Sequence, residues 1–119
     1  MTPGIFLSPD LSTLFFINSS SQKTDISLAN GKVAKVVLSG GNLTVTEESS
    51  MPGGGTSISF PVTSYNVALA YDPSTSKLHI IGVDDLQMGI AYRHNPIDLT
   101  GGTELYIGVD SGNFVAKVI

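Results

Sequence analysis

The sequence predicts an all-β fold of antiparallel strands, and three observations support this. No window of eleven or more residues keeps a helical period of apolar residues without an interrupting Gly or Pro. Short apolar or alternating runs recur along the whole chain. Clusters of turn-forming residues separate these runs at intervals of about eight to twelve residues, a spacing typical of β-sandwiches, barrels and propellers. The length of 119 residues predicts one domain over residues 1–119.

The expected strands form hairpins around recognisable turns. In Ser8-Pro9-Asp10 the proline presets φ and the aspartate can bond to the backbone ahead. Asn30-Gly31 is the strongest hairpin signal, because a type I′ turn needs positive φ at both central residues. The Gly-rich segment Ser49–Ser57 is expected to be a loop. The expected strands are Ile5–Leu7, Leu14–Ile17, Asp25–Ala29, Lys32–Leu38, Leu43–Glu47, Val67–Tyr71, Lys77–Val83, Met88–Tyr92, Leu105–Val109 and Phe114–Ile119.

Composition excludes several classes of function. The formal charge is −4, the pI is near 4.8 and the six basic residues are scattered, so we expect no nucleic-acid partner. The absence of cysteine excludes disulfides and thiolate metal sites. No apolar segment is long enough for a transmembrane helix and no signal peptide is evident, which predicts a soluble protein without a membrane partner and leaves its compartment open.

The catalytic motifs that the sequence offers are weak. Val109–Asn113 reads "VDSGN", similar to an aspartic-protease loop, but too few residues follow it to build the cleft, so we expect a hairpin turn. The pairs Glu47-Glu48 and Asp84-Asp85 point to opposite faces of a strand and form no carboxylate dyad by themselves. No phosphate-binding loop, Gly-x-Ser-x-Gly or His-Glu-x-x-His motif is present. We therefore predict no enzyme activity, cofactor or metal site.

Internal repeats suggest a repeated antiparallel unit. "VAKVV" at residues 33–37 recurs as "VAKVI" at 115–119, and "IGVD" at 81–84 recurs at 107–110. "GIFLSPDLSTLFFIN" followed by "DISLANGKVAKVV" resembles one blade of a β-propeller. "SYNVALAYDPSTSKLHIIGVDDLQMGIAYR" resembles the inner strands of a blade in fungal fucose-binding propeller lectins. Those lectins bind sugar with an Arg, an acidic residue and a Trp in each site, whereas this chain has one Arg and no Trp.

The resemblance implies propeller-like blades that are completed by oligomerisation. A blade takes about 40–45 residues and a closed propeller needs four or more blades, so one chain is too short to close the ring. We therefore expect a homo-oligomer. The alternative is a compact β-sandwich in which Met51–Ser57 crosses between two sheets.

The best candidate binding site is the segment "YRHNP", where an aromatic residue, the sole Arg, a His and an Asn occur together at a strand end. An Arg fork and an amide can bind vicinal hydroxyls, while an aromatic face packs on a sugar ring. The predicted ligand-binding residues are Tyr71, Tyr92, Arg93, His94 and Asn95.

These observations predict a non-enzymatic, lectin-like carbohydrate-binding module that becomes multivalent through oligomerisation. Its partner is expected to be a glycan or another neutral polar small molecule, since the chain is low in charge and rich in Ser, Thr and Asn. Two alternatives stay open. One is a structural subunit of a virus or phage fibre or decoration, and the other is a fragment of a hydrolytic propeller enzyme.

Overall fold

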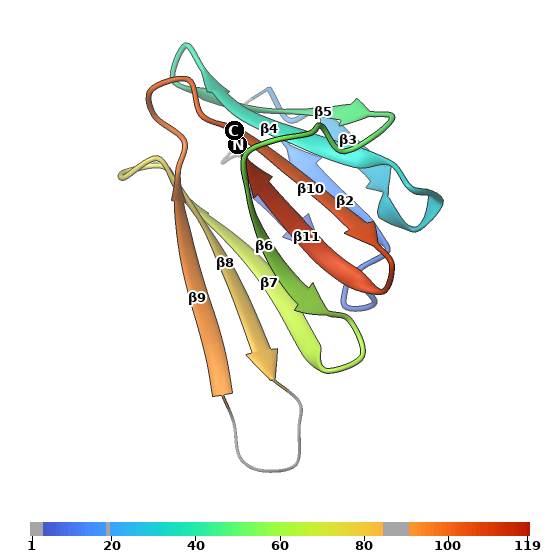
Figure 1. Ribbon diagram of the computed structural model, residues 1–119. Coiled ribbons are helices and arrows are strands. Elements are labelled where there is room, and N and C mark those ends of the chain that lie inside the picture. Colours follow the sequence, from blue (N-terminus) through green and yellow to red (C-terminus); the bar gives the residue numbers. More distant parts are fainter. Residues whose placement is uncertain (1–3, 19, 85–90) are drawn as a thin grey trace.

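The computed structural model describes residues 4–18, 20–84 and 91–119 (Figure 1). This part of the chain consists of antiparallel strands with one short 3-10 turn at Leu28–Asn30, so the predicted all-β fold is confirmed. The strands are β1 (Gly4–Leu7), β2 (Thr13–Ile17), β3 (Lys23–Ser27), β4 (Val33–Ser39), β5 (Asn42–Glu48), β6 (Thr56–Pro61), β7 (Tyr65–Asp72), β8 (Lys77–Asp84), β9 (Ala91–Asp98), β10 (Glu104–Asp110) and β11 (Asn113–Val118).

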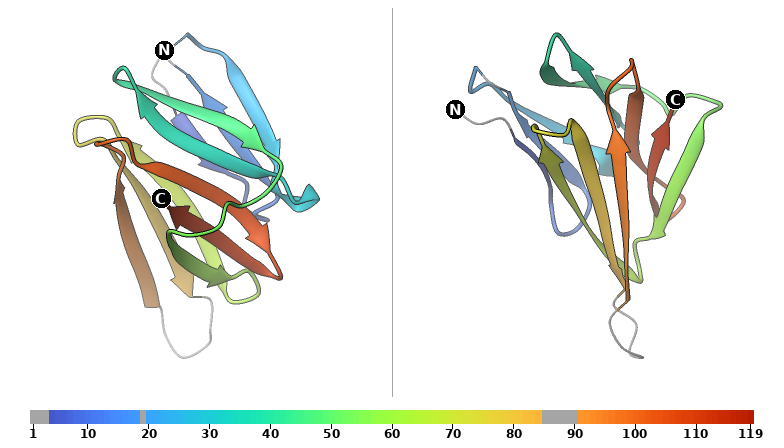
Figure 2. Two further views of the ribbon diagram at one scale, coloured as in Figure 1. Left: turned by 45° about the horizontal axis from the view of Figure 1, so that its top comes forward. Right: turned by 90° about the vertical axis from the view of Figure 1, so that its left-hand side faces the viewer.

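The strands form three sheets arranged in two layers (Figure 2). Sheet A has the order β1-β2-β3, sheet B the order β5-β4-β10-β11-β6, and sheet C the order β7-β8-β9. Strand β1 lies alongside β7, so sheets A and C make up one layer and sheet B the other. One apolar core contains side chains from all three sheets, among them Leu14, Ile26, Val36, Phe60, Leu78, Ile80, Leu105, Ile107 and Phe114.

Sheet B combines strands from distant parts of the chain. This sheet joins the hairpin β4–β5 to the hairpin β10–β11 through β4 and β10, and adds β6 at the far edge. The strands of a propeller blade come from one continuous segment of the chain. Sheets A and C are built in this way, whereas sheet B is not. The repeated "VAKVV" and "VAKVI" segments lie in β4 and β11 and flank β10 on its two sides.

Three local predictions differ from the structure. The Asn30-Gly31 hairpin is wrong, because β3 pairs with β2 and β4 pairs with β5 and β10. Gly31, at φ 75°, instead ends the 3-10 turn that carries the chain from sheet A to sheet B. Strand β6 was not predicted. The segment that includes Met51–Ser57 runs from β5 to β6 within sheet B, so it does not cross between sheets.

The other expected hairpins are confirmed. The turn at Ser8-Pro9-Asp10 joins β1 to β2, "DPSTS" joins β7 to β8, and "DSGN" joins β10 to β11. The predicted strand Met88–Tyr92 falls largely outside the described residues, and β9 continues from Ala91 to Asp98. In the described segments, no helix has the length and apolar character needed to cross a membrane.

Three turns share one aspartate-centred device. Asp10, Asp72 and Asp98 each accept a hydrogen bond from the backbone N–H two residues ahead and from the hydroxyl of that same residue. These bonds favour the ionised carboxylate and lower the pKa of all three groups. For Asp10, hydrogen bonds from Ser12 and Ser8 lower the pKa to about 2.

This device predicts a loss of stability in acid. Each carboxylate has a lower pKa in the folded chain than in the unfolded chain. In the pH range between these two pKa values the unfolded chain binds more protons than the folded chain, so the free energy of unfolding falls as the pH falls. We expect the melting temperature to decline from about pH 4 towards pH 2, measured by circular dichroism. The isosteric variant Asp10→Asn should melt below the wild type at pH 7, with the difference narrowing towards pH 2. Parallel pH curves for the two proteins would rule out Asp10 as a contributor.

Candidate functional site

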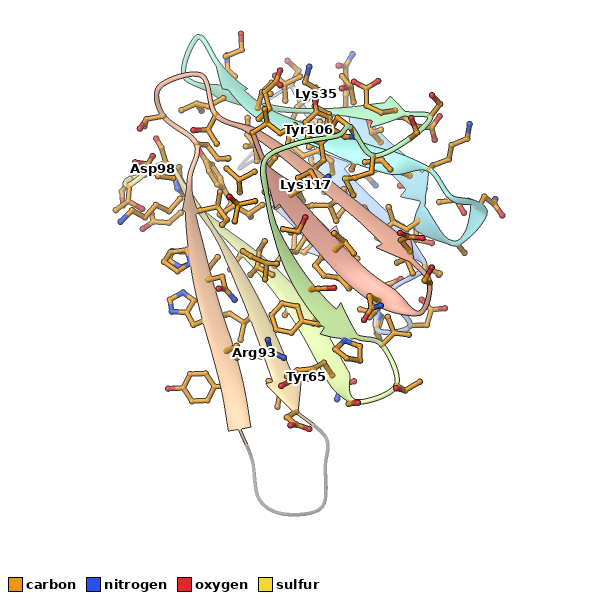
Figure 3. The ribbon with its side chains drawn as sticks, viewed as in Figure 1. Lys35, Tyr65, Arg93, Asp98, Tyr106 and Lys117 are labelled. Carbon is orange, nitrogen blue, oxygen red and sulfur yellow. The ribbon has the colours of Figure 1, made fainter. Side chains whose placement is uncertain are left out.

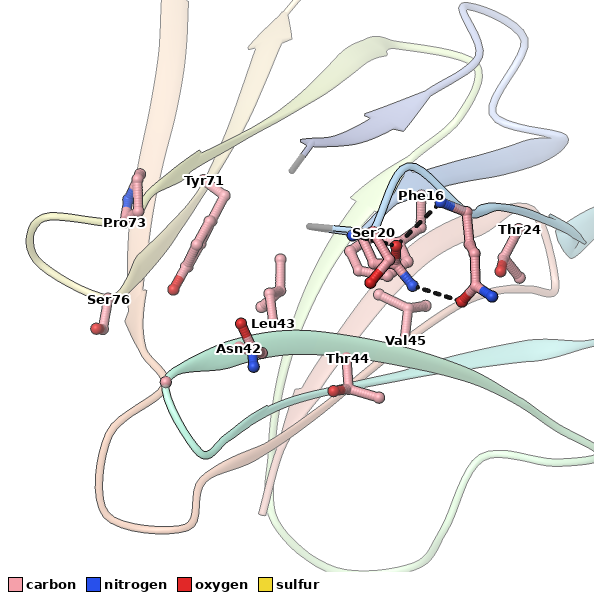
Figure 4. Close-up of a pocket in the computed structure, with 13 residues that line it drawn as sticks. Phe16, Ser20, Thr24, Asn42, Leu43, Thr44, Val45, Tyr71, Pro73 and Ser76 are labelled. Atoms are coloured by element: carbon pink, nitrogen blue, oxygen red, sulfur yellow. Dashed lines mark hydrogen bonds between the residues drawn. The ribbon is translucent and has the colours of Figure 1, made fainter. Parts of the chain in front are cut away.

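A cleft of about 450 Å³ lies where the ends of three hairpins meet (Figure 4). Its volume lies within the usual range for small-ligand sites, roughly 300–1,000 Å³. The β2–β3 hairpin and the β7–β8 turn belong to one layer, and the start of β5 belongs to the other. The lining residues are Phe16, Asn18, Ser20, Gln22, Thr24, Gly41, Asn42, Leu43, Thr44, Val45, Tyr71, Pro73 and Ser76.

Hydrogen bonds within each hairpin hold two walls of the cleft in position. In the β2–β3 loop, Asn18 Oδ1 accepts from the backbone N–H of Ser20 at 2.9 Å and of Gln22 at 3.0 Å. Asn18 Nδ2 donates to Gln22 Oε1 at 3.0 Å. Across the cleft, Asp72 accepts from the hydroxyl of Ser74 and so fixes the β7–β8 turn. Both walls are therefore ordered by contacts within the chain.

Apolar and aromatic side chains form the floor and two opposing sides. The side chains of Leu43 and Val45 are buried, as is Phe16, which is 4% exposed. Tyr71 is half-buried on the inner face of sheet C and stands on the side of the cleft opposite Phe16 (Figure 4). The cleft thus offers an aromatic ring and an apolar floor to a ligand.

The polar groups of the cleft are neutral and free to bind. Within the described part of the chain, the side chains of Thr24, Asn42 and Ser76 have no hydrogen-bond partner. The Thr44 side chain points away from the cleft, on the side of β5 opposite Leu43 and Val45 (Figure 4). The amide nitrogen of Gln22 is also available, because its Oε1 takes the bond from Asn18. None of the described residues that line the cleft carries a formal charge. This arrangement suits an uncharged ligand that has both hydroxyl groups and an apolar face.

The five residues predicted as one site lie in three places. Tyr71 lines the cleft. Tyr92 and His94 alternate with Arg93 and Asn95 along β9, so the first pair points outward from sheet C and the second pair points to its inner side. The structure does not bring these five side chains together.

Arg93 lies at the end of sheet C remote from the cleft. It pairs across the ladder with Gly82, whereas Tyr71 pairs with Leu78. Its guanidinium carbon lies 4.9 Å from the ring centre of Phe60 and 4.7 Å from that of Tyr65 (Figure 3). Its Nε donates to the Tyr65 hydroxyl at 3.2 Å. These contacts make Arg93 a packing residue that covers the edge of the core.

His94 pairs with His79 on the outer side of sheet C. Nε2 of His94 lies 2.6 Å from Nδ1 of His79, and the ring planes are inclined by 23°. In the described residues, no three His, Asp or Glu side chains are grouped so as to hold a metal ion.

The residues of the cleft that sequence reasoning missed carry no local motif. Phe16, Gln22 and Asn42 come from different hairpins, and only the packing of the two layers brings them near Tyr71. Asn42 follows Gly40-Gly41 and Gln22 follows a polar loop, so both look like ordinary turn residues in the sequence. These residues could be predicted only if it were known which hairpin ends lie next to each other in the fold.

A second hollow, of about 420 Å³, lies on the outer side of sheet B beneath the segment between β5 and β6. Val33, Met51 and Val115 contribute apolar surface to it. Lys117 Nζ donates to the carbonyl oxygen of Pro52 at 2.7 Å, which ties the segment to the sheet. The charge of Lys117 is thereby already engaged within the chain.

Comparisons with known proteins provide no family. No protein-family model, no curated protein and no solved structure gave a significant match to this chain. The case for a function therefore depends on the geometry and chemistry of the cleft.

Proposed function

We propose that the protein is a non-enzymatic, lectin-like module that binds a neutral glycan in the cleft between the β2–β3, β4–β5 and β7–β8 hairpin ends. The observation that carries the proposal is the composition of that cleft: Tyr71 and Phe16 lie on opposing sides, neutral amides and hydroxyls lie between them, and no described lining residue is charged.

A saccharide matches this chemistry. One face of a pyranose ring exposes C–H groups that pack on an aromatic ring such as that of Tyr71, while its hydroxyls both donate and accept hydrogen bonds. Asn42 and Gln22 supply amide groups, and Thr24 supplies a hydroxyl. Burying these groups is favourable only when they are paired, so a ligand that lacks hydroxyls would leave them unsatisfied.

The lack of charge among the lining residues that the structure describes also favours neutral over acidic sugars. A sulfate or carboxylate group would lose hydration on entering the cleft without meeting a cation among the lining residues. We further propose that copies of the chain associate, so that several weak sites act together on one glycan-bearing surface.

A second candidate is a structural subunit of a virus or phage particle. The observation that favours it is the exposed aromatic surface on the layer formed by sheets A and C, where Phe6 is 54% and Tyr92 71% exposed. A protein whose role is assembly would associate through such a surface and would bind no saccharide.

The test is a glycan array followed by calorimetry with a soluble, monovalent form of each ligand that binds. We expect binding to a subset of neutral glycans and little to sulfated or sialylated ones. Failure to bind any neutral glycan by folded protein would refute the proposal.

Arg93→Ala provides a distinguishing variant. It should lower the free energy of unfolding by about 1 kcal/mol through the lost cation–π contacts. It should leave saccharide affinity within about twofold of the wild type, because Arg93 lies away from the cleft. Loss of binding in a variant that remains folded would instead place the glycan at the Arg93 end of β9.

A further inference from the structure

The outer surfaces of the two layers differ in how far their side chains are engaged in contacts within the chain. On sheet B, Lys35 forms an ion pair with Glu104 at 3.1 Å, and its ammonium lies 5.9 Å from the ring centre of Tyr106 (Figure 3). Lys117 is bonded to the segment that crosses this sheet. Lys35, Glu104 and Lys117 of sheet B are thus engaged in contacts within the chain.

The outer surface of the other layer, formed by sheets A and C, carries aromatic side chains that are exposed to solvent. Phe6 and Phe15 lie directly opposite each other on β1 and β2 and are 54% and 40% exposed. Tyr92, at the other side of the layer, is 71% exposed. Three of the four large exposed apolar side chains in the described residues therefore lie on this layer.

Smaller apolar residues connect these aromatics across the middle of the layer. They alternate with core-facing residues on β7 and β8, so they point outward. We refer to this outer surface as the aromatic face. Its apolar residues are Phe6, Phe15, Ala68, Ala70, Ile81, Val83 and Tyr92.

We propose that the aromatic face binds a second copy of this chain in a two-fold symmetric dimer. Six strands at a spacing of about 4.8 Å, each about six residues long, give a face of roughly 600 Å² in projection. Because side chains protrude from the sheet, the accessible area of the face is larger than its projected area. The accessible area is therefore close to the roughly 800 Å² that each partner buries in a stable interface. The inference extends the self-association proposed above and depends on that part of the proposed function alone.

The distribution of charge on this face is compatible with self-association. Lys23 and Asp25 lie on β3 at one edge. Lys77 lies between Asp72 and Asp98 at one end of sheet C. These five side chains sum to −1, against −4 for the whole chain, and they lie on the edge strand β3 or at strand ends. His79 and His94 also lie on this face, beside Ala70 and Ile81, and their ring nitrogens contact each other at 2.6 Å. The face thus combines aromatic and aliphatic side chains with one internally paired polar group and a charged rim, a composition that protein interfaces tolerate.

Sedimentation equilibrium over a micromolar to submillimolar concentration range tests the proposal. The wild type should approach twice the chain mass of 12.4 kDa. The double variant Phe6→Lys/Phe15→Lys should raise the dimer dissociation constant at least about tenfold, because it places like charges at the apolar centre of the contact. Circular dichroism establishes that both proteins are folded.

Ile119→Lys is the matched control, since Ile119 is 46% exposed and lies outside the aromatic face. It should dimerise as the wild type does. A wild type that stays at 12.4 kDa, or a double variant that dimerises as tightly, would overturn the proposal. A monomer that floats with phosphatidylcholine vesicles through Phe6 and Phe15 would also overturn it and would identify lipid as the occupant. None of these outcomes depends on glycan binding.

Discussion

Phe60→Ala is expected to lower the free energy of unfolding by about 3–5 kcal/mol, the usual cost of deleting a buried ring. The side chain of Phe60 is fully buried. Its ring centre lies 5.2 Å from that of Tyr65 and 6.5 Å from that of Phe114. It also lies against Gly82, where an added Cβ would overlap the ring. Phe60 therefore connects sheet B to sheet C, and its loss leaves a cavity between the layers.

Urea unfolding followed by circular dichroism measures this effect. A double-mutant cycle tests the cause: Gly82→Ala should be costly in the wild type and less costly beside Phe60→Leu, because the shorter leucine leaves room for the added methyl group. Additive effects, or a loss below about 1 kcal/mol for Phe60→Ala, would contradict the packing of the two layers through this ring.

Tyr71→Ala is expected to weaken binding of a soluble neutral saccharide at least about tenfold, through loss of the aromatic surface on which the sugar ring packs. Tyr71 lines the cleft from β7, and its substitution leaves the hydrogen bonds of the β2–β3 wall untouched. Isothermal titration calorimetry with a monovalent ligand measures the change without a contribution from avidity.

Two further tyrosine variants complete the test. Tyr71→Phe keeps the ring and should bind within a few-fold of the wild type. Tyr92→Ala removes an exposed tyrosine from the outer side of the same sheet and should not alter monovalent affinity. Equal binding by Tyr71→Ala, or loss of binding in Tyr92→Ala alone, would move the site away from the cleft.

Hairpins between adjacent strands could be predicted from local sequence, whereas the strand order of sheet B depends on contacts between distant segments. The turns after β1, β7 and β10 form as their residues indicate, because each joins strands that stay adjacent. Asn30-Gly31 has the composition of a hairpin turn, yet β4 takes β5 and β10 as its neighbours. The apolar inner face of β4 is buried in the core between the two layers, and no local signal reports which distant strands pair with β4 in sheet B.

The candidate site was only partly predictable for the same reason. Tyr71 was predicted as a ligand-binding residue because an aromatic ring can stack on a sugar, and it lines the cleft. Asn42 and Phe16 were missed because they reach Tyr71 only through the stacking of the layers. Arg93 and His94 are neighbours in sequence, and the two-residue period of a strand directs them to opposite sides of β9.

The most direct test of the proposed function is chemical-shift mapping of the ¹⁵N-labelled protein during titration with a neutral oligosaccharide that binds on the array. The account predicts that the largest shifts occur around Gln22, Thr24, Asn42 and Thr44, on the two layers that border the cleft, and at Tyr71. Shifts that cluster on β9 around Tyr92–Asn95, with the cleft unperturbed, would contradict it.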